Sequence, residues 1–366
     1  MSITNKIEGI FRLLSPLHCA SVGDTGSEKN VMLTQKQSLI TRTGKRTFPI
    51  FPSNDMRGRL RRKAAALVLD HIVIAGKVKV DLYAGLMAGA ITASPESDLT
   101  VEEALRARDN VYMGLFGGGT RLLRSRFSTN DLVPVLADTI EARIVPAHFC
   151  EDWLPTGFIG DGVVGPLTGF GITDKRTSFR IDDVARVTNI NEMEQYIENV
   201  LVSVAKKQEE TLSGRKVRKD SKTAAKAGDI KTADIAGKKD IANMFAVESI
   251  MRGTPMYCLI DLQNDALDAH VGLLLLALQA LVREQALGGW IRIGFGRYSA
   301  ELVLTRNGQR YQVFALGQDA ANATLSAEVH TAFCVPAIAA MGTLTAESMM
   351  AFFTPRVAAK DVGVSA

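Results

Sequence analysis

YCLIDLQNDALDAHVGLLLLALQALVREQA, residues 257–286, sets a strand directly before a long apolar helix. Residues 257–263 are rich in β-forming side chains, and apolar and polar residues partly alternate among them, which predicts a strand. Residues 268–286 hold good helix formers around the run LLLL at 273–276. Gln279 interrupts this apolar stretch, which is too short to span a bilayer, so we expect a buried helix.

A similar pair of elements opens the chain. IEGIFRLL, residues 7–14, predicts a strand. The triplet SND at 53–55 is an N-cap signal ahead of 56–74, which hold good helix formers. We expect a helix there, with Arg57 and Arg61 on one face because they lie four residues apart.

The remaining elements continue this order. They are a helix at 101–116 that three glycines stop, a β-rich stretch at 133–145, a glycine loop at 287–297, and a hairpin at 300–305 and 311–315. Asn307 and Gly308 predict the turn of that hairpin. The order strand, helix, strands, insertion, strand, helix, strand predicts an α+β fold with an RRM-like (ferredoxin-like) palm. Such a sheet is a common platform for RNA.

The middle of the chain differs in composition. Residues 148–171 are rich in Gly and Pro, 172–187 predict a hairpin or extended arm, and 193–210 predict a helix. Residues 206–239 hold eleven Lys or Arg against five Asp or Glu, which leaves six positive charges. This segment has almost no large apolar side chain, so it cannot form its own core and predicts an exposed loop.

These shifts in composition predict the domain boundaries. We expect a discontinuous palm at 1–146 and 244–366. The region between them, 147–243, would be an inserted thumb and web with a helical or irregular part and the exposed basic loop.

The bulk composition excludes several classes of protein. Of 366 residues, 46% are hydrophobic and 22% charged, and the net charge of +4 excludes a uniformly basic surface. The four cysteines are scattered, so neither a zinc site nor a disulfide framework is expected. The histidines lack ligand spacing and no G-x-x-x-x-G-K-[ST] loop occurs, so we expect no metal and no cofactor. The polar N-terminus does not resemble a signal peptide, and we expect a soluble, cytoplasmic protein without a membrane segment.

Four segments in a fixed order resemble those of a known family. They are FRLLSPLH at 11–18, FPIFPSNDMRGRLR at 48–61, LFGGG at 115–119 running into RSRFS at 124–128, and FAVESIMRGT at 245–254 with the glycine loop after it. Together they resemble the RAMP superfamily of CRISPR-associated proteins, and within it the backbone subunit of class 1 effector complexes. The helix start matches the family pattern at Ser53, Arg57, Gly58 and Arg61 with one altered spacing. The resemblance covers nearly the whole chain and is most similar to the type IV systems.

The resemblance implies a hand-shaped, non-catalytic subunit for antiviral or antiplasmid defence. Copies of the subunit would stack helically along one CRISPR guide RNA, and each thumb hairpin would kink that guide. With other subunits of the effector complex, the filament would pair the guide with a target nucleic acid. The similarity to type IV systems implies a DNA target.

The predicted contacts are to the RNA backbone, because sequence-independent binding needs phosphate contacts. A helix N-terminus attracts anions, arginines add charge, and glycines let a backbone approach closely. The predicted RNA-binding residues are Ser53, Asn54, Arg57, Arg61, Gly117, Gly118, Gly119, Arg121, Arg124, Lys175, Arg176, Phe179, Arg292, Gly294, Phe295, Gly296 and Arg297.

Two regions of the middle of the chain have a second interpretation. Lys175, Arg176, Phe179 and Arg180 fall where the family's thumb hairpin lies, and they also fit an ordinary exposed hairpin. The basic segment 206–239 fits either a solvated loop or a contact with the target strand.

The alternative function is a RAMP-type ribonuclease acting on guide precursor or target RNA. Relatives that cut target RNA use an Asp in the loop after the first strand, whereas residues 29–46 contain no Asp or Glu. Asp24 and Glu28 lie earlier, outside the matching context. For His18, a general-acid role and a structural role both fit the sequence. We expect binding without cleavage and several copies per RNA.

Overall fold

The structure is a computed structural model that describes residues 5–21, 31–42, 44–89, 99–120, 122–149, 171–180, 243–315 and 320–354. Two compact units are present. The larger comprises Met1–Thr25, Leu33–Asp174 and Glu248–Ala366, and the smaller comprises Gly26–Met32 and Lys175–Val247. The predictions made for 193–210, for the basic segment 206–239 and for Arg121 lie outside the described residues.

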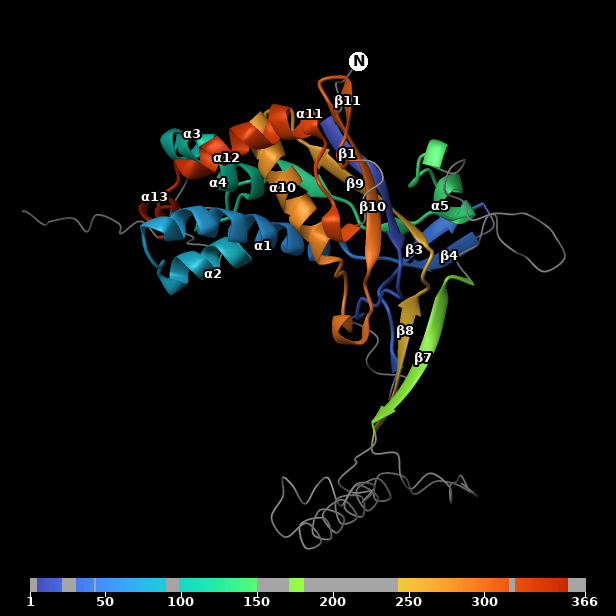
Figure 1. The fold of residues 1–366 in the computed structure, drawn as a ribbon. Helices are drawn as coiled ribbons and strands as arrows, with labels where there is room; N and C mark the ends of the chain where they lie inside the picture. Colours follow the sequence, from blue (N-terminus) through green and yellow to red (C-terminus); the bar gives the residue numbers. More distant parts are fainter. Residues whose placement is uncertain are drawn as a thin grey trace, which may run out of the picture. The chain divides into compact units, whose positions relative to one another are not determined.

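The larger unit is built on an antiparallel sheet of order β11-β10-β1-β9-β5, with β6 also paired to β9 (Figure 1). Its strands are β1 (Asn5–Leu13), β5 (Phe127–Thr129), β6 (Val133–Pro134), β9 (Pro255–Leu262), β10 (Tyr298–Arg306) and β11 (Gln309–Gln312). The central strand β1 pairs Leu13 with Tyr298 of β10 and Arg12 with Pro255 of β9. The end of β1 therefore meets the starts of β9 and β10 at one edge of the sheet.

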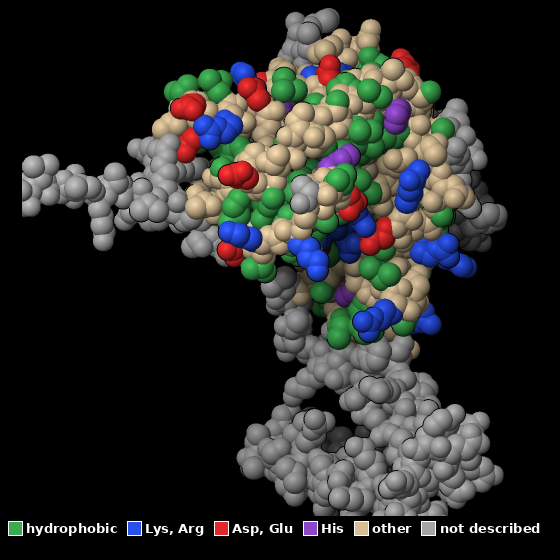
Figure 2. Space-filling view, turned by 60° about the vertical axis from the view of Figure 1, so that its left-hand side comes forward, with side chains coloured by type: hydrophobic (Ala, Val, Ile, Leu, Met, Phe, Trp, Pro, Cys, Tyr) green, Lys and Arg blue, Asp and Glu red, His purple; other side chains and the backbone are tan. Residues whose placement is uncertain are grey.

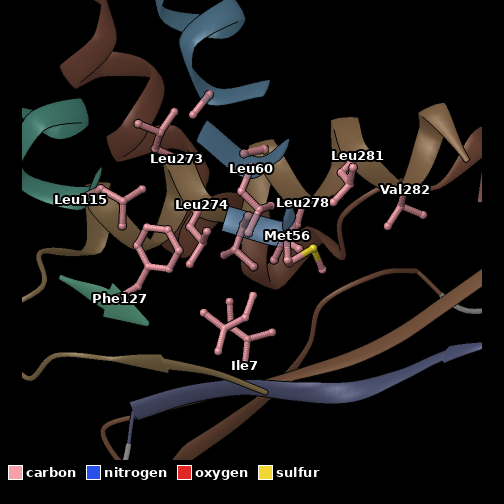
Figure 3. Close-up of a cluster of buried hydrophobic side chains, with 14 of the residues drawn as sticks. Ile7, Met56, Leu60, Leu115, Phe127, Leu273, Leu274, Leu278, Leu281 and Val282 are labelled. Atoms are coloured by element: carbon pink, nitrogen blue, oxygen red, sulfur yellow. The ribbon is translucent and has the colours of Figure 1, made fainter. Parts of the chain in front are cut away.

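Two long helices, α1 (Ser53–Ile72) and α10 (Asp268–Glu284), cover one face of this sheet (Figure 1). Ile7 of β1, Leu60 of α1 and Leu274 of α10 have no exposed surface, and Figure 3 shows such side chains packed between the helices and the strands. Burying one such side chain contributes about 1.5–3 kcal/mol, so this layer is the main core of the larger unit. 

Shorter helices and turns complete the helical layer. They are η1 (Val73–Ala75), α2 (Val80–Ala88), α3 (Val101–Asp109), α4 (Val111–Phe116), η3 (Ile291–Ile293), η4 (Ala320–Asn322), α11 (Ala327–Val329), η5 (His330–Cys334), α12 (Val335–Gly342) and α13 (Ala346–Met350). In the described ranges, no helix has the length and apolar character needed to cross a membrane.

The opposite face of the sheet is partly covered by a hairpin and a short helix. The hairpin joins β3 (Lys36–Thr41) to β4 (Gly44–Pro49), and the helix is α5 (Ala137–Glu141). Ile10 and Tyr257 project from the sheet into a second apolar cluster that includes Phe48 of β4.

A separate three-stranded sheet has the order β2-β8-β7. Its strands are β2 (Val31–Met32), β7 (Thr173–Arg180) and β8 (Asn243–Ile250), and β2 runs parallel to β8. Strands β7 and β8 each contribute residues to both units.

Several predictions from the sequence are confirmed. The class is α+β, and the strands at 7–14 and 257–263 and the helices at 56–74 and 268–286 match β1, β9, α1 and α10. The predicted hairpin is β10–β11, which pairs Arg306 with Gln309. Its two turn residues have positive φ, 51° at Asn307 and 82° at Gly308, as a two-residue hairpin turn requires.

Two predictions differ from the structure. The helix predicted at 101–116 is interrupted at Asn110, whose side-chain oxygen accepts hydrogen bonds from Tyr112 N and Met113 N at 3.0 and 2.8 Å and so starts α4. The β-rich stretch predicted at 133–145 holds only the two-residue strand β6. The Thr139 hydroxyl accepts from Leu136 N at 3.0 Å, which favours the short helix α5 there.

Candidate nucleic-acid interface

The segment after β1 and the glycine loop are hydrogen-bonded to each other although they are distant in sequence. Leu14 N and Ser15 N donate to Arg297 O at 2.8 and 3.2 Å. Arg297 N donates back to Ser15 Oγ at 2.8 Å, and Gly296 N donates to Pro16 O at 2.8 Å. These bonds fix the C-terminal end of the glycine loop beside β1.

Helix α1 and His18 hold the other end of the glycine loop. Gly289 N donates to His18 O at 2.8 Å. The Arg59 guanidinium donates to Ala286 O at 2.7 Å and to Gly288 O at 2.8 Å. A planar guanidinium that bonds two carbonyls restrains the loop more tightly than a single contact would.

The turn between β8 and β9 joins the same edge of the sheet. Gly253 N donates to Leu13 O at 2.7 Å, and Leu13 N donates to Thr254 O at 3.1 Å. Arg252 therefore precedes β9 on one side of β1, and Arg297 precedes β10 on the other. With neighbouring strands about 4.8 Å apart, their backbones are about 10 Å from each other. We call residues 14–18, 251–254 and 287–297 the glycine-loop surface.

Glu248, in the segment FAVESIMRGT, supports the glycine-loop surface from the interior of the protein. The buried Glu248 carboxylate accepts from Lys36 Nζ at 2.7 Å and from Thr34 N at 3.2 Å. His18 is 2% exposed, and its Nδ1 lies 2.7 Å from Glu248 O. Because a carbonyl can only accept, Nδ1 carries the hydrogen and the imidazole is held inside the fold. This contact favours the structural role for His18.

The glycine-loop surface combines exposed cations with exposed apolar side chains. Arg252, Arg292 and Arg297 are exposed, and within the described part of the chain none of them forms a salt bridge. The Arg297 guanidinium donates a long hydrogen bond to Gln285 Oε1, at 3.4 Å. The exposed apolar side chains of the surface are Leu14, Met251, Ile291 and Ile293. Figure 2 shows one face of the molecule, on which Lys and Arg side chains gather toward the lower right.

The two arginines predicted to bind phosphate from α1 contact protein instead. Arg61 is only 7% exposed, its Nη2 donates to Phe116 O at 2.7 Å, and its guanidinium lies 5.3 Å from the Phe116 ring. Arg57 is half-buried and donates to the same oxygen at 3.1 Å. Burial, and secondly the Arg61 cation, lower the pKa of Arg57. We therefore assign Arg61, together with Arg57, to holding the end of α4 instead of to phosphate contact.

The N-terminus of α1 already has an anionic partner. The helix begins at Ser53 after Pro52, and no side chain of the predicted SND triplet caps it. Ser53 N donates to Asp131 Oδ1 at 2.7 Å. A phosphate at Ser53 would have to displace this carboxylate, while Asn54 is exposed.

The three glycines after α4 are required by packing within the chain. Their φ angles are 62° at Gly117, 101° at Gly118 and 72° at Gly119. A Cβ on Gly118 would lie 2.4 Å from Gly89 O, and one on Gly119 would lie 2.5 Å from Phe352 O. Packing within the chain thus requires glycine at these positions, and contact of this segment with RNA stays a prediction.

The predicted residues of the glycine loop divide into two groups. Phe295 is 1% exposed and cannot stack on a base. A Cβ on Gly296 would lie 1.9 Å from Leu287 O, so this glycine serves loop closure. Gly294, in contrast, faces open space, and Arg292 and Arg297 are exposed beside it.

The other predicted residues are not part of the glycine-loop surface. Arg124 is exposed in the loop after α4. Lys175 and Arg176 are exposed on β7 in the smaller unit, and the Phe179 side chain lies outside the described residues.

Sequence reasoning missed one residue of this surface, Arg252, and one residue that holds it in place, Arg59. Arg252 stands in the FAVESIMRGT segment, and its place within a segment that carries the resemblance was a signal for it. Arg59 lies between the two predicted arginines, but its carbonyl partners are more than two hundred residues away. No local pattern could have selected it.

Comparisons with known proteins add little to this geometry. No family model matches the chain, and no curated protein matches it. A solved chain described as "Type IV-B CRISPR Complex" is similar, with a TM-score of 0.46 and 13% identity over 87% of this chain and 96% of that chain.

Proposed function

We propose that this protein is a non-catalytic subunit that binds a CRISPR guide RNA through the RNA backbone. Copies oligomerise along the guide and present it, with other effector subunits, for pairing with a target nucleic acid. One observation supports this most: two of the four sequence segments that resemble the RAMP superfamily, FRLLSPLH and FAVESIMRGT with the glycine loop after it, meet at the end of β1 and leave Arg252, Arg292 and Arg297 exposed.

The order of the elements is compatible with an RRM-like palm. Helix α1 follows β1, α10 follows β9, and the sheet places β1 between β9 and β10. A βαββαβ chain with split βαβ units has this arrangement. Under this proposal, the thumb would come from the inserted region 147–243.

The charge of the sheet face favours the loops over the sheet as the RNA site. The face opposite the two long helices carries Glu8 of β1, Asp261 of β9 and Glu301 of β10, against Lys6 and Arg12 of β1, so carboxylates outnumber cations among these five. Lys6 pairs with Glu8 at 2.7 Å. Burial raises the pKa of Asp261, and Lys6 opposes this effect. Carboxylates repel phosphates, whereas the three arginines at the edge attract them without reading the base sequence.

Expression of the protein together with a guide array tests the proposal. The purified protein should carry RNA of defined length, show a raised 260/280 absorbance ratio, and have a native mass that corresponds to several copies per RNA. A nucleic-acid-free monomer from that expression would refute the proposal. Multiple-turnover shortening of labelled guide precursor or target RNA would instead indicate the ribonuclease.

A further inference from the structure

Trp290 adopts a backbone conformation that its side chain disfavours. Its φ and ψ are 61° and 23°, in the left-handed region. For a bulky residue this region costs about 1–2 kcal/mol, and such outliers persist where the surrounding structure imposes them. Trp290 is also only partly buried. The chain thus keeps a large aromatic side chain at its surface in a strained backbone.

The backbone around Trp290 is fixed on both sides. Gly289 N, directly before it, donates to His18 O at 2.8 Å. The Trp290 carbonyl accepts from Ile293 N at 3.0 Å and from Phe295 N at 3.4 Å, and the Phe295 side chain is buried. Because these contacts define the loop before any ligand arrives, its backbone loses little conformational entropy on binding.

Cationic and apolar residues lie close to Trp290 in the sequence. Arg292 and Arg297 are exposed on the same loop, and the Ile291 and Ile293 side chains are 45% and 49% exposed. An aromatic platform flanked by positive charges is the arrangement with which proteins hold single-stranded nucleic acid. The arginines would contact phosphates while the ring contacts a base.

We infer that Trp290 stacks on one base of the bound single-stranded RNA, between phosphates held by Arg292 and Arg297. This inference rests on the proposed function and names the group that orders the strand at the glycine-loop surface. Every base has a π-face, so the contact holds the strand without selecting a sequence.

Fluorescence of the indole tests the inference directly. The chain has two tryptophans, Trp153 and Trp290, so Trp153→Phe leaves Trp290 as the sole indole in the full-length protein. This variant is titrated with an end-labelled single-stranded oligouridine and with an abasic backbone of equal length. Anisotropy of the label reports binding, and indole emission reports stacking. The oligouridine should quench Trp290, and the abasic strand should bind without quenching it.

The two readouts separate failure of the inference from failure of the proposed function. Normal anisotropy with unquenched Trp290 emission would overturn the stacking role while RNA binding stands. No anisotropy change with either strand would overturn RNA binding and the inference with it. Trp290→Ala should weaken oligouridine binding about 5- to 100-fold, from the usual value of one stacked base, and leave abasic binding unchanged. Trp290→Phe, which keeps a ring, should recover most of the affinity.

Discussion

Replacing Arg57 and Arg61 by alanine, singly and together, tests whether both arginines hold the Phe116 carbonyl. The two guanidiniums donate to this oxygen at 3.1 and 2.7 Å. Each variant leaves the other donor in place, and it also relieves the repulsion between the two cations. The single variants should therefore understate what the pair contributes, and the double variant should be destabilised by more than their sum.

The structure sets the magnitudes. Arg61 is buried, and its replacement by alanine removes a charged hydrogen bond and a ring contact. Because Arg57 still donates to the Phe116 oxygen in this variant, the free energy of unfolding should fall by about 2 kcal/mol. Arg57 is half-buried, and its loss should cost about 1 kcal/mol. In the double variant the Phe116 oxygen loses both donors, which adds about 1 kcal/mol and brings the total to about 4 kcal/mol.

Urea unfolding followed by far-ultraviolet circular dichroism measures these free energies. Arg62→Ala is the matched control, because Arg62 is next to Arg61 in the sequence and its side chain is exposed. This variant should change the free energy of unfolding by less than about 0.5 kcal/mol. Additivity of the two single variants within about 0.5 kcal/mol would refute the shared-acceptor reasoning.

Three further predictions concern other parts of the larger unit. Burial, and secondly the Arg126 cation, lower the pKa of His270 from 6.5 to about 4. Because the unfolded chain binds the proton more readily, the free energy of unfolding should fall by about 3 kcal/mol as the pH drops from 6.5 to 4. Urea unfolding measured across this pH range should show a flatter dependence for His270→Gln. Gly118→Ala should lower the free energy of unfolding by more than about 3 kcal/mol, because the new Cβ would lie 2.4 Å from a backbone oxygen. Gly294→Ala meets open space and should lower it by about 1 kcal/mol. Equal shifts in melting temperature for the two variants would contradict this. Arg292→Ala should lower the salt slope of RNA affinity by about 0.7 without changing stability, and Arg310→Ala, at the opposite end of the sheet, should leave the slope unchanged.

The elements with strong periodicity could be predicted from the sequence. The helix α10 and the strand β9 follow from an apolar run and a β-rich run that local side chains alone define. The hairpin β10–β11 follows from Asn307 and Gly308, which tolerate positive φ. In each case the deciding residues lie within the element itself.

Elements that depend on distant partners or on single caps could not be predicted. Asn110 ends one helix and starts another with one side chain, inside a stretch whose composition favours helix throughout. The hairpin β3–β4 is stabilised where Phe48 packs against the sheet, and its own sequence has no strong turn signal.

The roles of the arginines on α1 show the same limit for the candidate site. Arg57, Arg59 and Arg61 have the same charge and lie within five residues. Which carbonyls each of them binds depends on how the fold places α4 and the glycine loop beside α1. The sequence could indicate that positive charge gathers here, but only the fold assigns these side chains to holding loops and leaves Arg252, Arg292 and Arg297 exposed.

The salt dependence of RNA affinity tests most directly whether the glycine-loop surface holds the phosphates. With all three exposed arginines, Arg252, Arg292 and Arg297, replaced by alanine, the slope of log affinity against log salt should fall by about 2, since each phosphate contact on a single strand contributes about 0.7. Stability should remain that of the parent protein, because the three side chains are exposed. A folded triple variant whose slope equals that of the parent would contradict the account.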